Sequence, residues 1–477
     1  MIKVSETSTG IKIFDTQSRT NKEITISNGE YARMYCCGPT VYRDAHVGNL
    51  RTFLLSDLIA KLIKINGFKV KVIQNITDVG HMGEDFEGNE VGDDKVVAEA
   101  KKEKIDPFII ARKYEDLFHQ DLARLNIAPA EVYPRASEEI EGMQVLISGL
   151  IKSSYAYVGS DKSVYFDAQT FSSYGAISGN KLDSLKPGHK YEFKDDGAKK
   201  FHADWALWKA AGERTAMVWD SPWGSGFPGW HIECSAMSMH YLNNKVDVHV
   251  GGIDLRFPHH ENERAQSNAA SGDEVVDHWV HGEHLLFEGR KMSKSAGNVV
   301  LVQNIIDRGF DPLSVRLCFL ENRYRSQMDL SWDSIAAADS TIKRWRRKYQ
   351  EWRQVQDVHV ENSSANKFIA EVITDLNEDL DTPRAIVKLR ALERDESISA
   401  ITKANIFEKL DEFFSLGVTR SDQKVVLSDD VQKLLDSRSK ARQDKDFALS
   451  DQLRDELALR KIKVIDSAQG QSWEIIP

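Results

Sequence analysis

An α/β fold is what this sequence predicts, with a parallel-sheet domain interrupted by an insertion, then a helical bundle and a small C-terminal α+β domain. Three observations lead to it. Residues 30–75 have a strand, helix and strand pattern, residues 335–416 are almost entirely helical in pattern, and roughly the last 55 residues hold a charged helix pair and a short strand. The 477 residues have room for about three domains of ~100–200 residues each.

The first element is a βαβ unit. Glu30–Cys37 is an apolar strand pattern that ends at a Gly-Pro turn. Leu50–Asn66 places leucine and isoleucine on one helical stripe, and Gly67 ends that helix. Phe68–Asn75 then alternates as a second strand. The unit has the length that a Rossmann-like parallel sheet uses, so we expect a Rossmann-like domain here.

Later changes of pattern set the expected domain boundaries. The Gly/Asp-rich tracts 79–94 and 178–200 are expected to be loops, and the segment 136–171 between them belongs to the insertion. We expect a Rossmann-like catalytic domain at 1–125 and 220–285, an inserted connective domain at 126–219, a loop-bearing region at 286–334, a helical bundle at 335–418 and a C-terminal domain at 424–477.

Composition excludes several classes of protein. With 41% apolar residues the chain can fill a core, and no apolar run approaches the ~18 residues of a membrane span. Met1–Asp15 lacks the apolar segment of a secretory signal, so we expect a cytoplasmic protein with reduced cysteines. The net charge, 63 − 73 = −10, still permits a local basic strip, and Lys343–Lys348 is one. Cys36 and Cys318 are expected to be small buried residues.

Two short motifs suit phosphate chemistry. His46-Val47-Gly48-Asn49 lies where the first strand passes into the first helix, and a helix N-terminus offers free N–H groups to phosphate. Lys291-Met292-Ser293-Lys294-Ser295 carries lysines that can neutralise a leaving pyrophosphate. A plain turn and a solvated loop are the alternatives. Some 245 residues apart, the pair matches the two signatures of class I aminoacyl-tRNA synthetases.

A third group of residues suits a metal. His259 and Glu263 are four residues apart and share a helix face, whereas His260 points roughly a quarter turn away. Cys37 ends the first strand, and Cys234 follows a Gly-Trp-His-Ile-Glu run. A set of two Cys, one His and one Glu would leave a zinc ion open to one further ligand. A solvated His/Glu pair is the alternative, and spacing alone does not assemble the four.

Longer blocks make the sequence resemble the cysteinyl-tRNA synthetase family over nearly the whole chain. These blocks are Tyr35–Tyr42, Asn75–Asp78, Gly229–Met237, Gly251–Glu263 and Lys291–Ser295. The resemblance implies one zinc ion per chain on Cys37, Cys234, His259 and Glu263, with the thiolate of a substrate cysteine completing its ligands. A soft thiolate is a far better zinc ligand than the serine hydroxyl, so no editing domain would be needed.

The resemblance also implies roles for the other candidate residues. Thr77, Trp230 and His249 match the amino-acid pocket, Gly252 and Asp254 the ribose-binding loop, His46 and Asn49 the ATP phosphate contacts, and Lys291 and Lys294 the catalytic loop. Trp230 could instead be a core residue. Asn49 departs from the class signature, which has a second His, but an amide can still donate to phosphate. ATP is expected as a substrate with Mg²⁺.

For the C-terminal half the resemblance implies contact with tRNA. Region 286–334 would contact the tRNA stem, and the bundle, with its Asn377–Arg384 turn, would lead to the anticodon. Arg442, Asp451, Arg454 and Asp466 match the anticodon-reading positions. We expect Arg442 and Arg454 to lie about three turns apart along a helix at ~3.6 residues per turn. A solvated helix face is the alternative for each of these charges.

The expected function is cysteine–tRNA ligation, with tRNA(Cys), L-cysteine and ATP as partners, no membrane and a monomeric chain. The first alternative is a relative that joins activated cysteine to a small amino-sugar acceptor and lacks the anticodon-reading end. The second is a non-catalytic tRNA-binding paralogue, which should have lost active-site residues. The loop Val79–Asp94 is longer than the acidic turn common in the family, and the sequence assigns it no contact.

Overall fold

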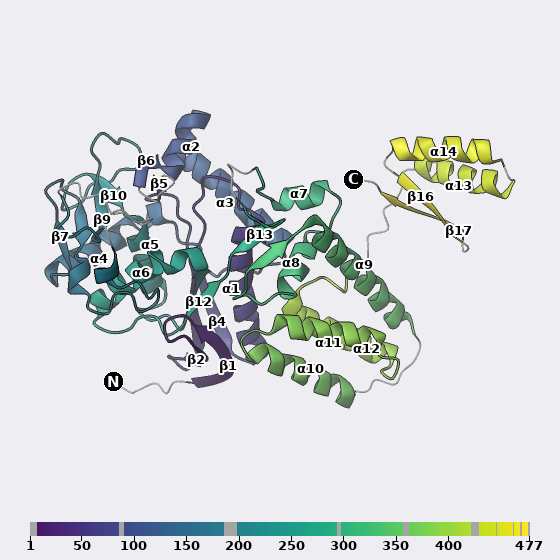
Figure 1. The fold of residues 1–477 in the computed structure, drawn as a ribbon, viewed down its shortest axis with the longest axis horizontal. Coiled ribbons are helices and arrows are strands. Elements are labelled where there is room, and N and C mark those ends of the chain that lie inside the picture. Colours follow the sequence, from purple (N-terminus) through teal and green to yellow (C-terminus); the bar gives the residue numbers. More distant parts are fainter. Residues whose placement is uncertain are drawn as a thin grey trace.

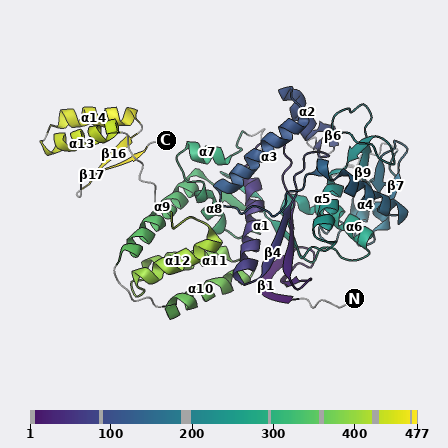
Figure 2. The ribbon, with the colours of Figure 1, turned by 180° about the vertical axis from the view of Figure 1, so that it is seen from behind.

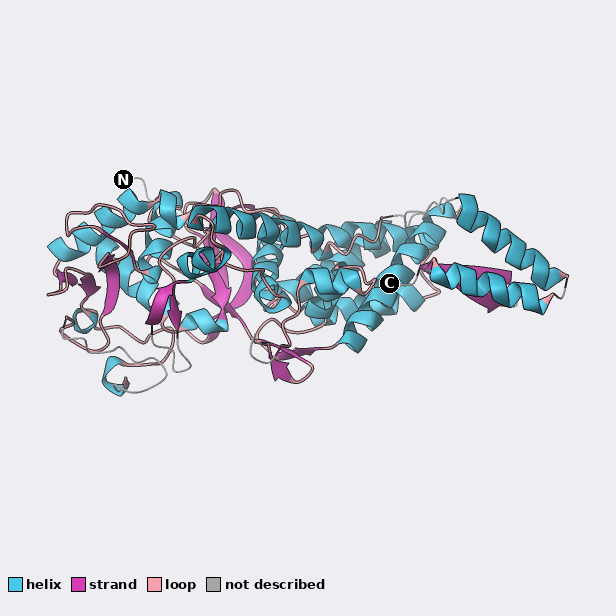
Figure 3. Cartoon of the chain, turned by 90° about the horizontal axis from the view of Figure 1, so that it is seen from above, coloured by secondary structure: helices cyan, strands magenta, loops and turns pink. Residues whose placement is uncertain are grey.

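The structure of the chain is a computed structural model that describes residues 7–84, 90–185, 198–292, 297–355, 362–420, 429–444, 446–460, 462–467 and 470–475. It confirms the mixed α/β fold class. In three views the last two helices and their hairpin stand apart from the rest of the chain (Figures 1, 2 and 3). None of the described helices is long and apolar enough to cross a membrane.

A parallel sheet forms the centre of the body, in the order β12-β11-β3-β4. Its strands are β3 (Tyr31–Cys36), β4 (Lys69–Gln74), β11 (Val248–Gly252) and β12 (Trp279–Gly282). The helix α1 (Val47–Ile65) connects β3 to β4, so the predicted βαβ unit is present, with the helix beginning earlier than expected. The chain later returns to the other side of β3, which makes a topological switch point between β3 and β11.

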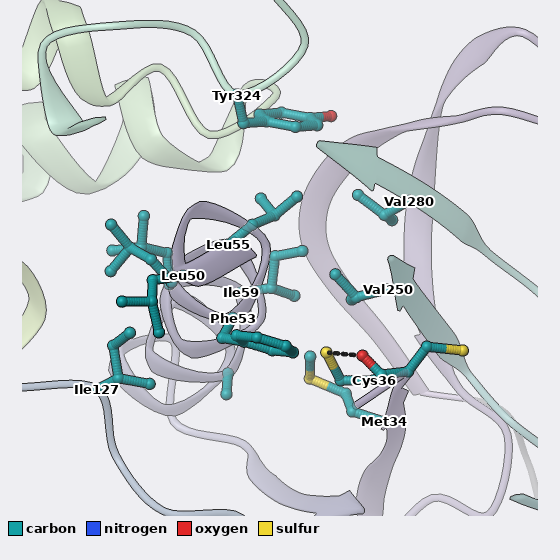
Figure 4. Close-up of a cluster of buried hydrophobic side chains, with 14 of the residues drawn as sticks. Met34, Cys36, Leu50, Phe53, Leu55, Ile59, Ile127, Val250, Val280 and Tyr324 are labelled. Atoms are coloured by element: carbon teal, nitrogen blue, oxygen red, sulfur yellow. Dashed lines mark hydrogen bonds between the residues drawn. The ribbon is translucent and has the colours of Figure 1, made fainter. Parts of the chain in front are cut away.

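Apolar side chains of α1 pack on this sheet. Figure 4 shows Phe53 and Ile59 of α1 facing Met34, Cys36 and Val250 of the strands. All of them are buried, as the stripe in the sequence predicts. Cys318 is likewise buried, in α8 (Leu313–Leu320). This packing places the first turn of α1 at the edge of the sheet where β3 and β11 end.

The insertion forms a second, antiparallel sheet in the order β10-β9-β8-β7. The helix α4 (Ile140–Lys152) precedes it, and α5 (Trp230–Tyr241) and α6 (His259–Ser271) pack beside α4. Its strands are β7 (Ala156–Val158), β8 (Val164–Phe166), β9 (Trp205–Ala210) and β10 (Gly226–Pro228). The strand β10 therefore lies past residue 219, and α5 begins directly after it.

Shorter elements complete the body. They are β1 (Thr7–Asp15), β2 (Thr20–Ile26), β5 (Met82–Glu84), β6 (Glu90–Asp94), α2 (Lys95–Glu103), α3 (Pro107–Arg124), η1 (Ala136–Glu138), η2 (Ala168–Thr170), η3 (Leu182–Ser184), η4 (Ile253–Arg256), β13 (Leu285–Phe287), β14 (Arg290–Lys291), α7 (Val302–Asp307), α8 (Leu313–Leu320) and β15 (Met328–Leu330). Part of the tract 79–94, expected as a loop, is the small antiparallel pair β5 and β6.

The described residues that follow form four helices, in agreement with the helical pattern of residues 335–416. They are α9 (Trp332–Gln354), α10 (Asn362–Asn377), α11 (Thr382–Arg394) and α12 (Ala400–Phe414). The strip Lys343–Lys348 lies on α9, but it is not an open basic surface. Trp345 is fully buried, and the cations pair with acids, for example Arg344 with Glu393 at 2.7 Å and Arg346 with Asp311 at 2.6 Å.

A buried arginine joins this bundle to the body. Arg316 of α8 is fully buried and donates to the carboxylate of Asp57 at 2.8 Å, on α1. The same guanidinium donates to the carbonyl of Phe414 at 2.6 Å, at the end of α12, and to the carbonyls of Leu125 and Asn126 at 3.0 Å. The arginine therefore connects four segments that are far apart in sequence.

The C-terminal domain has its own small core. It consists of α13 (Asp429–Gln443), α14 (Phe447–Leu459) and the antiparallel hairpin β16 (Ile462–Ser467) and β17 (Gly470–Ile475). Val431, Leu435, Leu457 and Ile462 form an apolar cluster separate from the main core among the described residues. The helix pair and first strand agree with the sequence pattern, and the second strand was not predicted.

Candidate functional site

The candidate site lies where β3 and β11 end. Cys37 follows β3 directly, and Gly251 and Gly252 are the last residues of β11. A Cβ on Gly251 would lie 2.3 Å from Cε1 of His260, so only glycine lets α6 approach this strand so closely. Parallel strands end on one edge of the sheet, and ligands of open α/β sheets bind at such switch points.

Cys37, Cys234, His259 and Glu263 meet at this edge. Their ligand atoms all lie within 4.8 Å of one another, and each residue is at most 4% exposed. The two sulfurs are 3.8 Å apart, and Nε2 of His259 is 2.9 Å from Oε1 of Glu263. Two thiolates at ~2.3 Å from a tetrahedral zinc would also lie ~3.8 Å apart. The donor types and spacing therefore fit a metal of zinc's size and preference.

The protein alone does not supply the charge that this cluster needs. Burial raises the pKa of Cys37 and of Glu263. Burial also acts to raise the pKa of Cys234, but hydrogen bonds with Cys37 and His259 outweigh it and lower this pKa. A buried set of thiols and a carboxyl becomes a good ligand set only when a cation compensates the lost protons. The cluster is therefore compatible with a metal site.

A second group overlaps the first. Nε2 of His249 and Nε2 of His260 each lie 3.4 Å from Sγ of Cys37, and burial lowers the pKa of both rings. The quarter turn between His259 and His260 thus does not remove His260 from the cluster, and no motif indicated this contact. Nδ1 of His260 contacts Nε2 of His281 at 2.8 Å, which fixes the orientation of the His260 ring.

The predicted amino-acid pocket residues surround the same cluster. Thr77 is buried and accepts a hydrogen bond from Asn75 Nδ2 at 3.0 Å, while Oδ1 of Asn75 accepts from the Gly38 amide at 2.8 Å. Trp230 is the first residue of α5, and its ring centroid lies 4.3 Å from that of His259. It is only half-buried, so it is not a plain core residue. Asn75 holds the β4 end to the β3 end, a role that its motif did not reveal.

His46 and Asn49 cap α1 and bond each other. The Asn49 amide donates to Nδ1 of His46, and the His46 amide donates to Oδ1 of Asn49, both at 3.2 Å. Burial and the charge of Arg43 lower the pKa of His46 to about 4, so the ring is neutral near pH 7. Because Nδ1 accepts, the ring proton is on Nε2, where it can be donated to a phosphate oxygen.

The two class I signatures meet in space. The Val47 amide donates to the carbonyl of Val300 at 2.9 Å, and a Cβ on Gly48 would lie 2.8 Å from Cε of Met292. The second signature therefore packs on the first turn of α1. Lys291 is exposed at the end of β14, and Lys294 lies outside the described residues.

The predicted ribose loop lies beside these signatures. Asp254 is in η4, and a Cβ on Gly252 would lie 2.3 Å from its Oδ1 and 3.4 Å from Oγ1 of Thr52, on α1. The charge of Asp254 also acts on His46, which indicates that the two side chains are near each other. The structure thus brings the proposed metal, amino-acid, ribose and phosphate contacts to one edge of the sheet.

Comparisons with known proteins agree with this arrangement. Residues 23–340 match the family model of the class I (C) tRNA synthetase catalytic domain, and residues 425–473 match the anticodon-binding domain of cysteinyl-tRNA ligase. The chain is 37% identical to cysteine–tRNA ligase 1 of Burkholderia lata, over 97% of this chain and 96% of that one. It is 35% identical to the cysteine–tRNA ligase of Thermus thermophilus, over 98% of this chain and 99% of that one.

The chain belongs to the cysteinyl-tRNA synthetase family of class I aminoacyl-tRNA synthetases. Among solved structures, a methionyl-tRNA synthetase of Mycobacterium tuberculosis in complex with methionyl-adenylate matches with a TM-score of 0.53 at 13% identity, over 81% of this chain and 88% of that one. This likeness shows the shared fold of the body. Family membership confirms the resemblance that the sequence blocks indicated.

Of the residues proposed to read the anticodon, Arg442, Asp451 and Arg454 are exposed. Arg442 is on α13, whereas Asp451 and Arg454 are on α14, so the expectation of one helix with about three turns between the arginines is wrong. A break after Gln443 separates the helices. Nη1 of Arg454 lies 3.1 Å from Oδ1 of Asp451. In the backbone register of the hairpin, Asp466 lies opposite Gln471.

Proposed function

We propose that this chain activates L-cysteine with ATP, forming cysteinyl adenylate and pyrophosphate, and then transfers cysteine to the terminal ribose of tRNA(Cys). The observation that carries the proposal is the buried set Cys37, Cys234, His259 and Glu263 beside the packed class I signatures. Family membership supplies the reaction class, and the donor set supports cysteine as the amino acid.

The four donors would hold one zinc ion, which when bound supplies a Lewis acid that favours a substrate thiolate over a serine hydroxyl. The chain's own residues do the rest. Thr77 and Trp230 would bound the amino-acid pocket, and His249 would form its wall. His46, Asn49 and Lys294 would meet the phosphates of ATP, which enters with Mg²⁺. Gly252 lets the Asp254 carboxylate approach the end of β11, where it would bind the ribose.

Two assays on the purified chain test this proposal. Cysteine-dependent exchange of pyrophosphate into ATP should be rapid, and aminoacylation of a tRNA(Cys) transcript should follow. Removal of metal by a chelator should abolish both, and added zinc should restore them. Serine-dependent exchange should be slower by orders of magnitude. Serine exchange at a rate close to that of cysteine would refute the proposed reason for the metal.

The amino-sugar alternative is weaker, because the chain carries residues 425–473 that match an anticodon-binding domain. The non-catalytic alternative is also weaker, because His46, Lys291 and the four proposed ligands are all present. Aminoacylation of an amino sugar in preference to tRNA would favour the first alternative. We also propose a monomer in the cytoplasm, where the four buried cysteines stay reduced.

A further inference from the structure

The segment that follows Thr77 is longer than the family's usual acidic turn, and the structure shows where its two ends are held. Gly80 has φ +84°, and its amide donates to Oδ2 of Asp94 at 2.6 Å. A Cβ on Gly80 would lie 2.3 Å from Oε1 of Glu233, so the segment runs directly against α5. Asp94 caps α2 and lies 3.6 Å from the guanidinium of Arg214.

One side chain of this segment reaches the amino-acid pocket. The ring of His81 stacks on the indole of Trp230, with centroids 4.0 Å apart and planes at 10°. The indole is only half-buried, so core packing alone does not hold it. The indole is less parallel to the ring of His259, since those two planes are tilted by 34°.

Both nitrogens of His81 are engaged. Nδ1 lies 2.5 Å from Oγ1 of Thr40, and the ammonium of Lys95 contacts Nε2. An ammonium has no acceptor, so Nε2 accepts and Nδ1 carries the proton that Thr40 receives. Thr40 belongs to the turn after β3, and Lys95 opens α2. The imidazole plane is therefore held between two elements, and its flat face is presented to Trp230.

We propose that His81 is a positioning residue that holds the Trp230 indole in the orientation that receives the substrate amino acid. The inference rests on the proposed function, because it takes Trp230 as a wall of the amino-acid pocket. An indole free to change rotamer would have to be ordered when substrate binds, and that ordering lowers affinity. With His81 present, the indole is already ordered in the folded chain, so substrate binding does not have to order it.

The test uses the full zinc-loaded chain and two readouts, the KM for cysteine in pyrophosphate exchange and calorimetric titration of cysteine. An aromatic stack contributes enough that His81→Ala should weaken cysteine binding by about 3- to 10-fold. The KM for ATP and the kcat of exchange should change by less than about twofold, since the lost contact holds the amino acid equally in the ground state and the transition state. Zinc content should stay at one per chain.

Two further variants separate the ring from its nitrogens. His81→Phe keeps a stacked ring and should restore cysteine affinity to near that of the unchanged chain. Thr40→Val should raise the KM for cysteine in the unchanged chain but have no effect in the His81→Phe background, because phenylalanine offers no nitrogen to Thr40. His240→Ala, on the exposed end of α5, is the matched histidine control and should change nothing.

Each contrary result has a distinct meaning. An active chain in which His81→Ala leaves cysteine binding unchanged overturns this inference and leaves the proposed function intact. Loss of zinc, or an equal rise in the KM values for ATP and cysteine, assigns His81 a structural role and also overturns it. His81→Phe as weak as His81→Ala rules out the stack. If the chain without any substitution shows no cysteine-dependent pyrophosphate exchange, the proposed function is refuted, and this inference with it.

Discussion

The metal-ligand cluster and the proposed anticodon residues are built in opposite ways. The four cluster residues are each at most 4% exposed. They come from the residue after β3 and from α5 and α6, elements that belong to the main core. Arg442, Asp451 and Arg454 are exposed on two helices whose core contains only a few apolar residues. Burying donors is costly unless something compensates them, whereas an exposed charge costs little.

This difference decides how much each arrangement teaches about function. Two thiols, an imidazole and a carboxyl at one buried point have no ordinary structural purpose, so their geometry argues strongly for a ligand. An exposed arginine beside an aspartate, such as Arg454 beside Asp451, is common on any helix. Experiments on the two regions should therefore differ in what they affect and in size.

The largest effect is expected from removal of a proposed ligand. Cys234→Ser should lose stoichiometric zinc and nearly all exchange activity, because a hydroxyl is a poor ligand for zinc. Elemental analysis and pyrophosphate exchange measure the two effects. Cys318→Ser, a buried cysteine far from the cluster, is the matched control and should keep its zinc. A Cys234→Ser chain with full metal and activity would disprove the assignment.

The next largest effect is expected at the second signature. Lys294→Ala should slow exchange by roughly 100- to 1000-fold, because pyrophosphate charge in the transition state loses its cation. Calorimetric titration should show nearly normal cysteine binding. Lys101→Ala, an exposed lysine on α2, should leave both measurements unchanged. An exchange rate unaffected by Lys294→Ala would remove this residue from the catalytic set.

In the C-terminal domain the effect should be smaller and confined to tRNA. Arg454→Ala should reduce aminoacylation by roughly 10- to 100-fold, since one base-specific arginine contact contributes ~1–3 kcal/mol. Exchange, which needs no tRNA, should stay nearly constant. Arg460→Ala removes a neighbouring arginine that pairs with Asp430 and Glu456 and should have little effect. A fall of both activities in Arg454→Ala would indicate a folding role instead.

The smallest effect is expected where the signatures touch. Gly48→Ala places a Cβ 2.8 Å from Cε of Met292, the far end of a flexible side chain, so the loop can shift at little cost. We expect exchange to fall by about 3- to 10-fold and Met292→Ala to restore part of it in the double variant. Additive losses in the double variant would show that the contact does not transmit the effect.

The sequence predicted the elements that carry the site better than the contacts between them. The strand before Cys37 and the helix after His46 follow from apolar periodicity, and the structure has both. The meeting of Cys37 with α5 and α6 did not follow from spacing, because about 200 residues separate them and only longer blocks shared with a family linked them. The contacts of His260 and Asn75 were not predicted, because their partners, Cys37 and Gly38, are distant in sequence.

Other limits of the sequence were local. The tract 79–94 has a loop-like composition, yet Gly80 and Asp94 bond each other across it and place His81 on Trp230. The pairing of the basic strip on α9 could not be predicted, because acidic partners such as Glu393 and Asp311 are distant in sequence. Helix α13 ends at Gln443 without glycine or proline, and the local sign of the break is Asp446, whose carboxylate accepts from the Leu449 amide and caps α14. The expectation of one helix through Arg442 and Arg454 overlooked this cap.

The buried Arg316 joint has a mechanical consequence. Tilting the bundle against α1 would break hydrogen bonds to Asp57 and Phe414 in a place that water does not reach, and unpaired buried groups are costly. The bundle and α1 are therefore stiffly coupled, and His46 caps the end of α1 that lies at the edge of the sheet. Because the C-terminal domain has a core of its own, its displacement would leave these buried hydrogen bonds intact.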